Sequence, residues 1–585
     1  MPGFFKMFFA SLLAIIVASL LSILVIVLFV GSLTGKQKVK LQSKTVLVLD
    51  LSQNYREQLV RNPFAAFSKE DEGEVPGLYD VVRMIEKAKD DKNISGILIV
   101  AKPNANGFAA SEEIRNVLLD FKKSKKFIYA TSDVLTQKSY YVASAADQIF
   151  LNPSGAIEWL GFTVDLVFFK GTLDKLDIQP QIFYAGKFKS ATEPFRTHKM
   201  TPENKLQTTV WLNNLYAHFL QQISLSRKID TATLHRLANE AIIQTPQDAF
   251  NNKLVDGLKY DDQIKELIRQ KLRLKKDQKI NFITINQYAD AGDFRQKGKE
   301  RIALIYAQGD IIDGKSEQPG FIASEDYVKI ICRARLDKTV KAIVFRVNSG
   351  GGSALASENI WRELSLAKKE KPLVVSFGDV AASGGYYISC AADSIFAEPN
   401  TITGSIGVFA IIPNMEGFFK NKLGITFDGV KTGNYGDGGG VRPMSEKEKQ
   451  MVQQGVEKLY KQFKQRVATG RKKSVDYIDS IAQGRVWSGN DAIKIGLVDK
   501  LGNLQDAIDC AARMAKLKDY RLKEYPEPFD NVFDKLMKST SPFTYEQKLK
   551  TELGEEFYSA YRQLLQVKRM VGTVQARLPF EFSIR

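Results

Sequence analysis

The sequence has 585 residues, 44% hydrophobic and 25% charged. These proportions are ordinary for two or three globular domains and exclude a disordered chain. The formal net charge is +17, but the lysines are spread along the chain without arginine-rich blocks. This indicates a solvated basic surface rather than a nucleic-acid groove.

The chain has three cysteines, which are Cys332, Cys390 and Cys510. They provide neither a disulfide framework nor a zinc motif. We expect no metal or cofactor.

The N-terminal stretch predicts a membrane anchor. No charged residue occurs from Met7 to Gly35, and residues 8–30 are nearly all apolar. About 20 helical residues cross a bilayer, and the stretch is longer than the apolar region of a cleaved signal peptide. We therefore expect one uncleaved transmembrane helix within residues 1–36. Flanking charge alone would leave the rest of the chain in the cytoplasm, although long domains can translocate regardless of it; the lysines after the span are Lys36, Lys38, Lys40 and Lys44.

Two halves of the chain repeat one design. With a constant shift of 246 positions, residues 92–150 align with residues 338–396. The matches include the pair Tyr140-Tyr141 with Tyr386-Tyr387, and Ala145-Ala146-Asp147 with Ala391-Ala392-Asp393. The duplication predicts two related domains in one chain.

Each half opens with an apolar strand, at residues 46–51 or 302–307, and then alternates helix and strand. This order is typical of a parallel sheet with crossover helices. An amphipathic helix closes each half, over residues 206–223 in the first. We predict an N-terminal domain at residues 44–285, a C-terminal domain at residues 300–516, and a mostly helical tail at residues 517–585. We interpret the tail as an oligomer or domain contact.

The segment 372–396 in the second half carries a candidate nucleophile. Residues 373–377 predict a buried strand, small residues follow, and residues 386–392 predict the start of a buried helix. Ser383 therefore lies at a strand-to-helix junction, where unpaired backbone N–H groups favour an oxyanion. Gly384 and Gly385 leave its hydroxyl unshielded. A tight turn of small residues is the alternative interpretation of this motif.

The first half lacks these features at the aligned positions. Gln137-Lys138-Ser139 stand opposite Ser383-Gly384-Gly385, and Trp159 stands opposite Ser405. The second half also has a glycine loop at residues 348–353, whose consecutive N–H groups could bind an oxyanion. Its counterpart in the first half, residues 102–107, has a single glycine. The first half therefore has no nucleophile at the position of Ser383.

A nucleophilic serine needs a base, and none of the histidines lies in a glycine-rich or helix-start context: His198, His218 and His235. A lysine is the natural alternative. Aligning Gly186 with Gly433 places Lys189 of the first half opposite Gly436 of the second. Burial could lower the lysine pKa enough for this role, and Lys187 is the competing candidate, more simply interpreted as solvated. A working site would therefore join the two halves.

Four motifs resemble those of the signal peptide peptidase A (protease IV) family, long form, which are membrane-anchored Ser-Lys peptidases. They are Ala381-Ala382-Ser383-Gly384-Gly385-Tyr386, Thr403-Gly404-Ser405-Ile406-Gly407, the loop at residues 347–352 and the segment at residues 189–194. The resemblance implies that Ser383 is the nucleophile, Lys189 the general base, and Ser405 the hydroxyl that orients the lysine. It also implies that the N–H groups of Gly351 and Gly384 form the oxyanion hole. The family usually has proline where this chain has Gly350.

The resemblance extends to fold, substrates and location. It implies an α/β protein of tandem duplicated Clp-protease/crotonase-like domains with helical extensions, preceded by one transmembrane helix. It further implies a homo-oligomer, a tetramer, in the bacterial inner membrane, with a single span and the bulk of the chain on the periplasmic side. The implied substrates are signal-peptide remnants and other apolar peptides, with no nucleic-acid partner.

Three other functions are compatible with parts of the sequence. Residues 309–316 fit a P-loop pattern, but Asp310 and Asp313 would repel phosphate, and Pro319 and Gly320 interrupt the helix that a P-loop must enter. An acyl-CoA enzyme of the crotonase fold could also use a glycine-rich oxyanion loop. The third alternative is a catalytically silent membrane scaffold.

Overall fold

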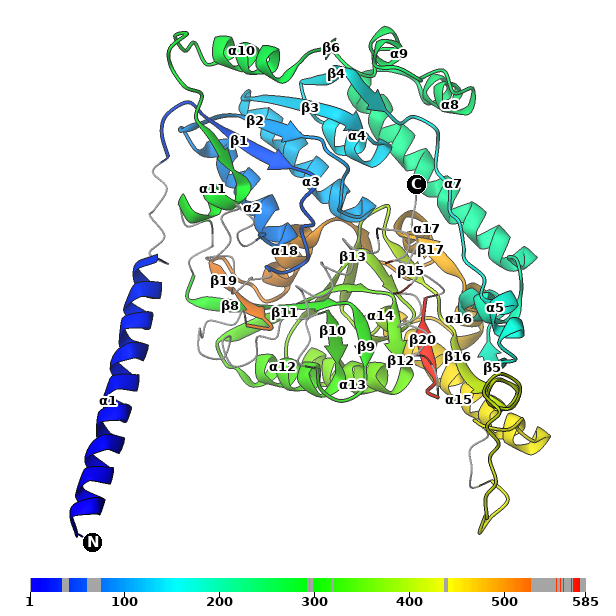
Figure 1. The fold of residues 1–585 in the computed structure, drawn as a ribbon. Coiled ribbons are helices and arrows are strands. Elements are labelled where there is room, and N and C mark those ends of the chain that lie inside the picture. Colours follow the sequence, from blue (N-terminus) through cyan, green and yellow to red (C-terminus); the bar gives the residue numbers. More distant parts are fainter. Residues whose placement is uncertain are drawn as a thin grey trace.

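The computed structural model describes residues 2–33, 41–59, 75–291, 294, 298–316, 320–435, 440–527, 554, 558, 561, 570 and 572–578. An N-terminal helix, α1 (Pro2–Leu33), precedes two parallel sheets with helices on their faces and a third, mixed sheet (Figure 1). Among the residues described, no helix is both long enough and apolar enough to cross a membrane.

The first sheet is built from the first half alone. Its strands are all parallel and lie in the order β6-β4-β3-β2-β1-β7. Their bounds are β1 (Thr45–Asp50), β2 (Ile94–Val100), β3 (Phe127–Leu135), β4 (Gln148–Ile157), β6 (Gly257–Leu258) and β7 (Phe282–Thr284). The predicted βα alternation of this half is therefore present.

Helices cover both faces of this sheet, so its strands are apolar on both sides. Ile97 and Ile99 of β2 pack into the larger core, whereas Leu98 between them faces Ile264 and Ile268 of α10. The helices of the first half are α2 (Leu78–Asp90), α3 (Phe108–Phe121), α4 (Gln137–Ala143), α5 (Lys170–Lys175), α6 (Glu193–Arg196), α7 (Pro202–Arg227), α8 (Thr231–Asn239), α9 (Pro246–Asn251), α10 (Asp261–Lys271) and α11 (Ile285–Ala291).

The second sheet repeats this arrangement with residues of the second half. Its main path is β17-β15-β13-β11-β8-β19, parallel except for β17, with β14 beside β13 and β18 beside β14. The bounds are β8 (Glu300–Gln308), β11 (Val340–Ser349), β13 (Leu373–Ala382), β14 (Ser394–Ala397), β15 (Ile402–Gly404), β17 (Val486–Ser488), β18 (Lys500–Leu501) and β19 (Tyr520–Tyr525).

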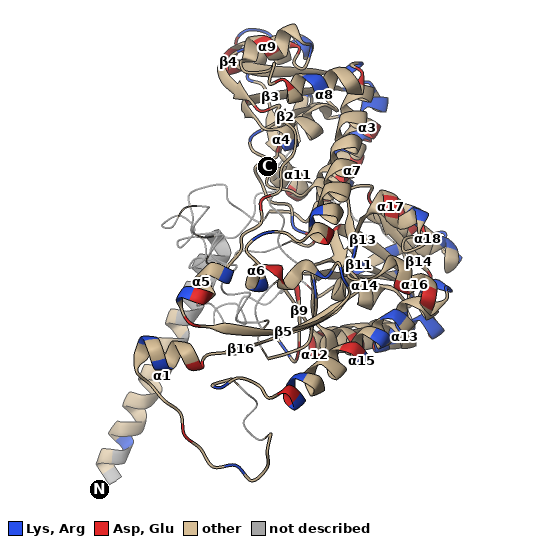
Figure 2. Cartoon of the chain, turned by 90° about the vertical axis from the view of Figure 1, so that its right-hand side faces the viewer, with Lys and Arg blue, Asp and Glu red and all other residues tan. Residues whose placement is uncertain are grey.

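The long helices α7 and α15 begin at matching caps in the two halves. The Thr201 side chain accepts the N–H of Asn204 ahead of α7, and Ser445 and Glu448 form a capping box at α15; both arrangements satisfy N–H groups that a helix start leaves unpaired. The helices of the second half are α12 (Ser324–Leu336), α13 (Ala354–Glu370), α14 (Gly384–Ser389), α15 (Glu446–Arg471), α16 (Val475–Ile481), α17 (Gly489–Lys494) and α18 (Leu504–Met514). Basic and acidic residues are interspersed along the helices (Figure 2).

The mixed sheet joins segments from both halves and from the C-terminal end. Its order is β10-β9-β12-β20-β16-β5. The bounds are β5 (Gln179–Ala185), β9 (Asp310–Ile312), β10 (Phe321–Ala323), β12 (Gly351–Ser353), β16 (Val408–Asn414) and β20 (Gln575–Arg577). Strand β5 of the first half pairs antiparallel with all of β16, from Ala185 opposite Val408 to Gln179 opposite Asn414. This pairing carries a first-half segment onto the second half.

The helical tail predicted at residues 517–585 stays a prediction, because most of it lies outside the described residues. Within the described part, β19 extends the second sheet and β20 enters the mixed sheet. A short strand flanked by polar residues lacks the apolar periodicity that sequence patterns detect, so these pairings were not foreseen. The four domain boundaries stay predictions.

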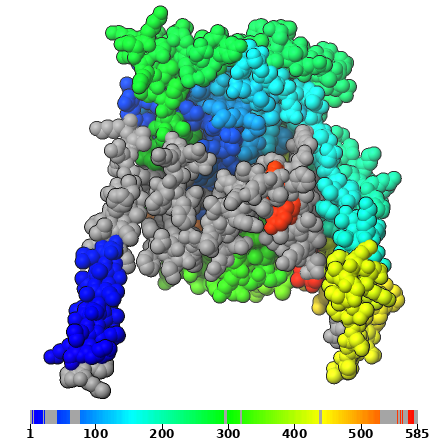
Figure 3. All heavy atoms as spheres, in the orientation of Figure 1, coloured from blue at the N-terminus to red at the C-terminus, as the bar shows by residue number. Residues whose placement is uncertain are grey.

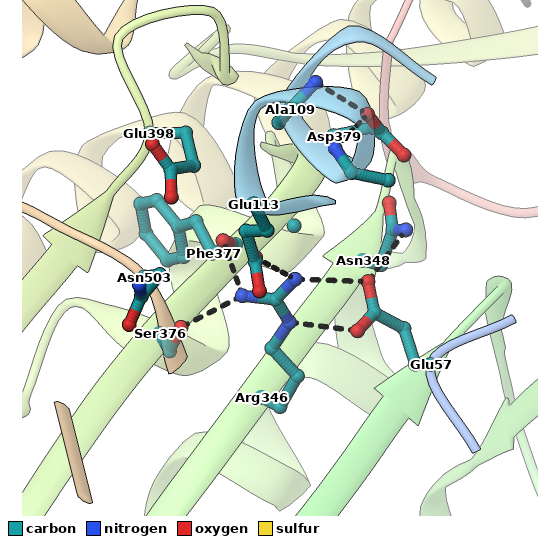
Figure 4. A network of polar contacts seen from close by, with 12 residues as sticks. Glu57, Ala109, Glu113, Arg346, Asn348, Ser376, Phe377, Asp379, Glu398 and Asn503 are labelled. Atoms are coloured by element: carbon teal, nitrogen blue, oxygen red, sulfur yellow. Dashed lines mark hydrogen bonds and ion pairs between the residues drawn. The ribbon is translucent and has the colours of Figure 1, made fainter. Parts of the chain in front are cut away.

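A buried ion network links the two halves (Figure 4). The fully buried guanidinium of Arg346, on β11, donates to Glu57 at 2.8 Å and to Glu113 of α3 at 2.6 Å. Its remaining N–H groups reach Ser376 Oγ and the carbonyl of Phe377 at 2.8 and 2.9 Å. Burial raises the pKa of Glu113 to about 7, against the opposing effect of the arginine charge. The buried guanidinium of the second half is therefore paired with two carboxylates of the first half.

Arg346→Met should lower the free energy of unfolding by about 3–5 kcal/mol, because Glu57 and Glu113 lose their buried counter-ion. Urea denaturation of the purified protein measures this loss. Lys494→Met is a suitable control, since Lys494 pairs with Asp491 but leaves 71% of its side chain exposed; its loss should stay below about 1 kcal/mol. Equal losses in the two variants would contradict a structural role for the network.

Candidate active site

Ser383 lies at the junction of β13 and α14. The strand is longer than predicted because Val380, Ala381 and Ala382 pair with β15, and the helix ends early as the chain turns into β14. Ser383 adopts φ 53° and ψ −112°, backbone values that cost a non-glycine residue about 1–3 kcal/mol and cluster at functional sites. Its N–H donates to Gly404 O at 2.8 Å, which helps to hold this conformation.

Lys189 reaches Ser383 from the first half by way of β5. After the strand, Gly186 turns the chain with φ 104°, and its carbonyl accepts the N–H of Lys189 at 3.0 Å. The N–H of Phe188 donates to Gln483 O at 2.8 Å. A Cβ built on Gly484 would lie 2.6 Å from the nitrogen of Lys189, so only glycine permits this approach. The second half therefore fixes the backbone that carries the lysine.

The lysine amine makes three polar contacts. Lys189 Nζ lies 2.9 Å from Ser383 Oγ, 3.0 Å from Ser405 Oγ and 3.1 Å from Ser405 O. Ser383 Oγ also lies 3.4 Å from Gly407 O. A neutral amine has two hydrogens and one lone pair. It can donate both hydrogens to Ser405 and still accept the hydroxyl hydrogen of Ser383.

The environment of Lys189 favours the neutral form. Only 1% of its surface is exposed, and burial lowers its pKa well below the ordinary value of 10.5. Desolvation penalises an ammonium ion, which needs water or a counter-ion. Burial therefore favours an uncharged amine beside a buried hydroxyl.

The competing candidates lie elsewhere. Lys187 is exposed, with Nζ 5.4 Å from the centre of the Phe188 ring. His218 contacts Glu112 at 3.1 Å within the first half. Residues 309–316 contain β9, and α12 begins only at Ser324. This segment therefore lacks the strand-loop-helix arrangement of a P-loop.

The predicted oxyanion donors lie next to each other. A Cβ built on Gly351 would lie 2.6 Å from the nitrogen of Gly384. The N–H of Gly351, however, donates to Ser349 Oγ at 3.1 Å. The glycine loop therefore lies beside the residue that follows Ser383. Of the two predicted oxyanion donors, the Gly351 N–H already donates to a side chain of its own loop.

A cavity of about 360 Å³ adjoins the glycine loop at Gly350, between the two halves. Trp211 and Leu215 of α7 contribute apolar surface, and Lys138 and Asp379 contribute charged groups. Burial lowers the pKa of Lys138 and raises that of Asp379. The cavity borders the glycine loop but is not lined by Ser383 or Lys189. Sequence reasoning did not anticipate it, because its walls come from distant segments.

The family model for peptidase family S49 matches residues 120–276 and 365–518, one segment in each half. Protease 4 of Salmonella typhi is 37% identical over 524 residues, covering 86% of this chain and 83% of that protein. Protease 4 of Haemophilus influenzae is 32% identical over 548 residues, covering 88% and 87%.

A plant protein gives a third match. The chloroplastic serine protease SPPA of Arabidopsis thaliana is 32% identical over 459 residues, covering 77% of this chain and 68% of that protein. The family match spans both halves and the relatives match over most of their length, which confirms the resemblance predicted from the sequence motifs. This chain belongs to peptidase family S49 and is a serine peptidase.

Proposed function

We propose that the chain is a membrane-anchored endopeptidase in which Lys189 of the first half activates Ser383 of the second. The observation that carries the proposal is the 2.9 Å contact between Lys189 Nζ and Ser383 Oγ at a buried site. Neutral Nζ accepts the hydroxyl proton as Oγ attacks the carbonyl carbon of a peptide. The same proton then passes to the leaving amine as the C–N bond breaks.

Water completes the reaction. Lys189 Nζ accepts a proton from a water molecule as the water oxygen attacks the acyl-enzyme. The same proton then passes from Nζ to Ser383 Oγ as the ester bond breaks. Ser405 holds both amine hydrogens and so directs the lone pair toward Ser383. The N–H groups of Gly384 and Gly351 stabilise the oxyanion once the Gly351 N–H is released from Ser349.

The buried lysine also bears on the alternative functions. A buried amine without a counter-ion is costly to the fold because its charged form loses hydration. A silent scaffold would gain nothing from that cost. The adjoining cavity is lined by Asp310 and Asp379 as well as by Lys138, a mixed lining that is not selective for the anionic nucleotide of an acyl-CoA. These features favour the peptidase.

We propose that residues 1–36 anchor the peptidase in a bacterial inner membrane, with the bulk of the chain in the periplasm. The helix α1 has 32 residues, which at 1.5 Å per residue gives about 48 Å. Tryptophan and leucine side chains in the cavity suit apolar peptides such as signal-peptide remnants.

The internal duplication supports a homo-oligomer, and the family resemblance suggests a tetramer. The segment aligned with β5 is residues 426–432, and it exposes Phe427 and Val430. The segment aligned with β16 is residues 162–168 of the first half. We propose that residues 426–432 of one copy pair with residues 162–168 of the next, as β5 pairs with β16 within the chain. Light scattering that finds only monomers would contradict this.

Hydrolysis of apolar peptides by the detergent-solubilised protein tests the proposed activity. We expect new peptide termini by mass spectrometry, and loss of cleavage after a fluorophosphonate modifies Ser383. The modified residue should be identified by peptide mapping. Cleavage that continues after complete modification of Ser383, or a protein that cleaves no apolar peptide, would contradict the proposal.

A further inference from the structure

The mixed sheet contains a slot one strand wide beside Ser383. One edge of the slot is β12, which carries Gly351. The other edge is β16, which begins directly after Gly407, and the Gly407 carbonyl lies 3.4 Å from Ser383 Oγ. The two edges do not pair with each other, because β20 lies between them (Figure 1). An extended peptide in such a slot gains main-chain hydrogen bonds on both sides.

The occupant of the slot is the C-terminal strand of the chain itself. β20 runs antiparallel to β12, from Gly351 opposite Arg577 to Ser353 opposite Gln575. It also pairs antiparallel with β16, through Gln575 opposite Phe409. In Figure 3 described residues near the C-terminus, in red, lie on the same face as the cyan residues of the first half. The chain thus fills a position that a substrate strand could occupy.

The strand brings a carbonyl to the predicted oxyanion donors. A Cβ built on Gly351 would lie 2.1 Å from Ala576 O, and one built on Gly384 would lie 2.9 Å from the same oxygen. Ala576 is fully buried, and Arg577 after it forms an ion pair with Asp310. A substrate carbonyl that precedes the scissile bond must also reach these glycines. Ala576 therefore occupies the place of such a residue.

The residue after the strand fixes the orientation of the glycine loop. Leu578 N–H donates to Gly350 O at 2.7 Å, while the N–H of Gly351 donates to Ser349 Oγ at 3.1 Å. A trans peptide unit is planar, so its C=O and N–H point in opposite directions. In a single orientation of the Gly350–Gly351 peptide, the carbonyl therefore accepts the Leu578 N–H while the N–H on the opposite side donates to Ser349. Glycine on both sides of this peptide allows it to rotate at little steric cost.

We propose that β20 is an autoinhibitory strand. It fills the slot for the acyl side of a peptide substrate, and through Leu578 it holds the Gly350–Gly351 peptide so that the Gly351 N–H cannot serve the oxyanion. Departure of the strand opens both edges and frees the peptide to rotate. The inference rests on the proposed function, since it takes Ser383 as the nucleophile.

Proline at position 578 offers a sharp test, because it removes the N–H that Gly350 accepts. Leu578→Pro and deletion of residues 574–585 should each raise kcat/KM for a short fluorogenic apolar peptide. They should also raise the rate of fluorophosphonate labelling of Ser383. We expect both rates to rise about tenfold or more, which corresponds to a wild type in which about nine molecules in ten are inhibited. Leu578→Ala keeps the N–H and is the matched control, so its rates should stay near those of the wild type.

A peptide added in trans gives an independent measurement. The peptide with the sequence of residues 572–580 should inhibit the deletion variant competitively, and the same peptide with proline in place of Leu578 should inhibit more weakly. If the deletion variant fails to fold, both peptides are tested against Leu578→Pro instead, and the rates of that variant together with the inhibition decide. Equal rates for Leu578→Pro and Leu578→Ala, together with no inhibition by either peptide, would overturn the proposal.

The two proposals fail in different ways. If neither the wild type nor any variant cleaves peptides or is labelled at Ser383, the proposed peptidase site is wrong. If the wild type is active and releasing the strand changes neither rate, the peptidase site stands and only the autoinhibitory role of β20 is excluded.

Discussion

Ser383→Ala should lower kcat for peptide hydrolysis by about 10⁴–10⁶-fold while KM changes little. The hydroxyl is the only atom of this side chain that can form the acyl-enzyme, and loss of a serine nucleophile from a hydrolytic site costs factors of this order. Steady-state kinetics with a fluorogenic apolar peptide measures the effect, on protein purified free of other peptidases.

Ser389→Ala provides a matched control for this substitution. Ser389 lies on the same short helix, is 1% exposed, and donates its hydroxyl to Gly385 O at 2.7 Å. Its loss removes a buried hydroxyl of the same size without touching the proposed chemistry. A similar loss of kcat in the two variants would show that Ser383 acts through packing and not as a nucleophile.

Lys189→Met should lower kcat by about 10²–10⁴-fold, the usual contribution of a general base, and should also stabilise the fold. In the unfolded chain the amine keeps its ordinary pKa and binds a proton at neutral pH, whereas burial in the folded chain lowers the pKa and favours the neutral form. Folding of the wild type therefore releases a proton, and its stability falls as pH drops below the unfolded pKa. Methionine removes this penalty.

The stability gain therefore has a defined pH dependence. It should be largest near neutral pH and should shrink as the pH approaches about 10.4, where the unfolded lysine also becomes neutral. Thermal melts across this range measure it, and the exposed Lys187→Met is the control in both assays. A loss of stability at neutral pH in Lys189→Met would show that the folded protein holds the lysine charged.

The sequence predicted the architecture well where the signal is local or repeated. Apolar runs such as residues 97–100 and 343–346 predicted parallel strands, and the 246-residue shift predicted two related halves. The observed strand β2 (Ile94–Val100) begins before its run, and β11 (Val340–Ser349) extends beyond its run at both ends, because backbone hydrogen bonding is not limited to the apolar residues.

The position of Lys189 illustrates what sequence alone cannot supply. Its alignment opposite Gly436 indicated that a site would join the halves, but not how. The antiparallel pairing of β5 with β16 and the close approach at Gly484 depend on contacts between residues more than 200 positions apart. The buried network of Arg346 is likewise invisible, since isolated charges along a sequence do not reveal their partners.

The C-terminal strand shows a further limit. Residues 575–577 have no periodicity that distinguishes a strand from a loop, and their role depends entirely on the slot between β12 and β16. The hydrogen bond from the Gly351 N–H to Ser349 belongs to the same orientation of the Gly350–Gly351 peptide as the contact with Leu578. Gly350 itself accepts the Leu578 N–H at 2.7 Å, which gives a structural context for the glycine that stands where the family usually has proline.

The pH dependence of kcat/KM tests most directly whether an uncharged lysine of the first half acts on the serine of the second. The rate should rise as the free enzyme loses one proton and should level off well below 10.5, the ordinary pKa of lysine. The residual activity of Lys189→Met should lack this rise. A wild-type rate that climbs only near the ordinary lysine pKa, or a rise at lower pH that persists in Lys189→Met, would contradict the assignment.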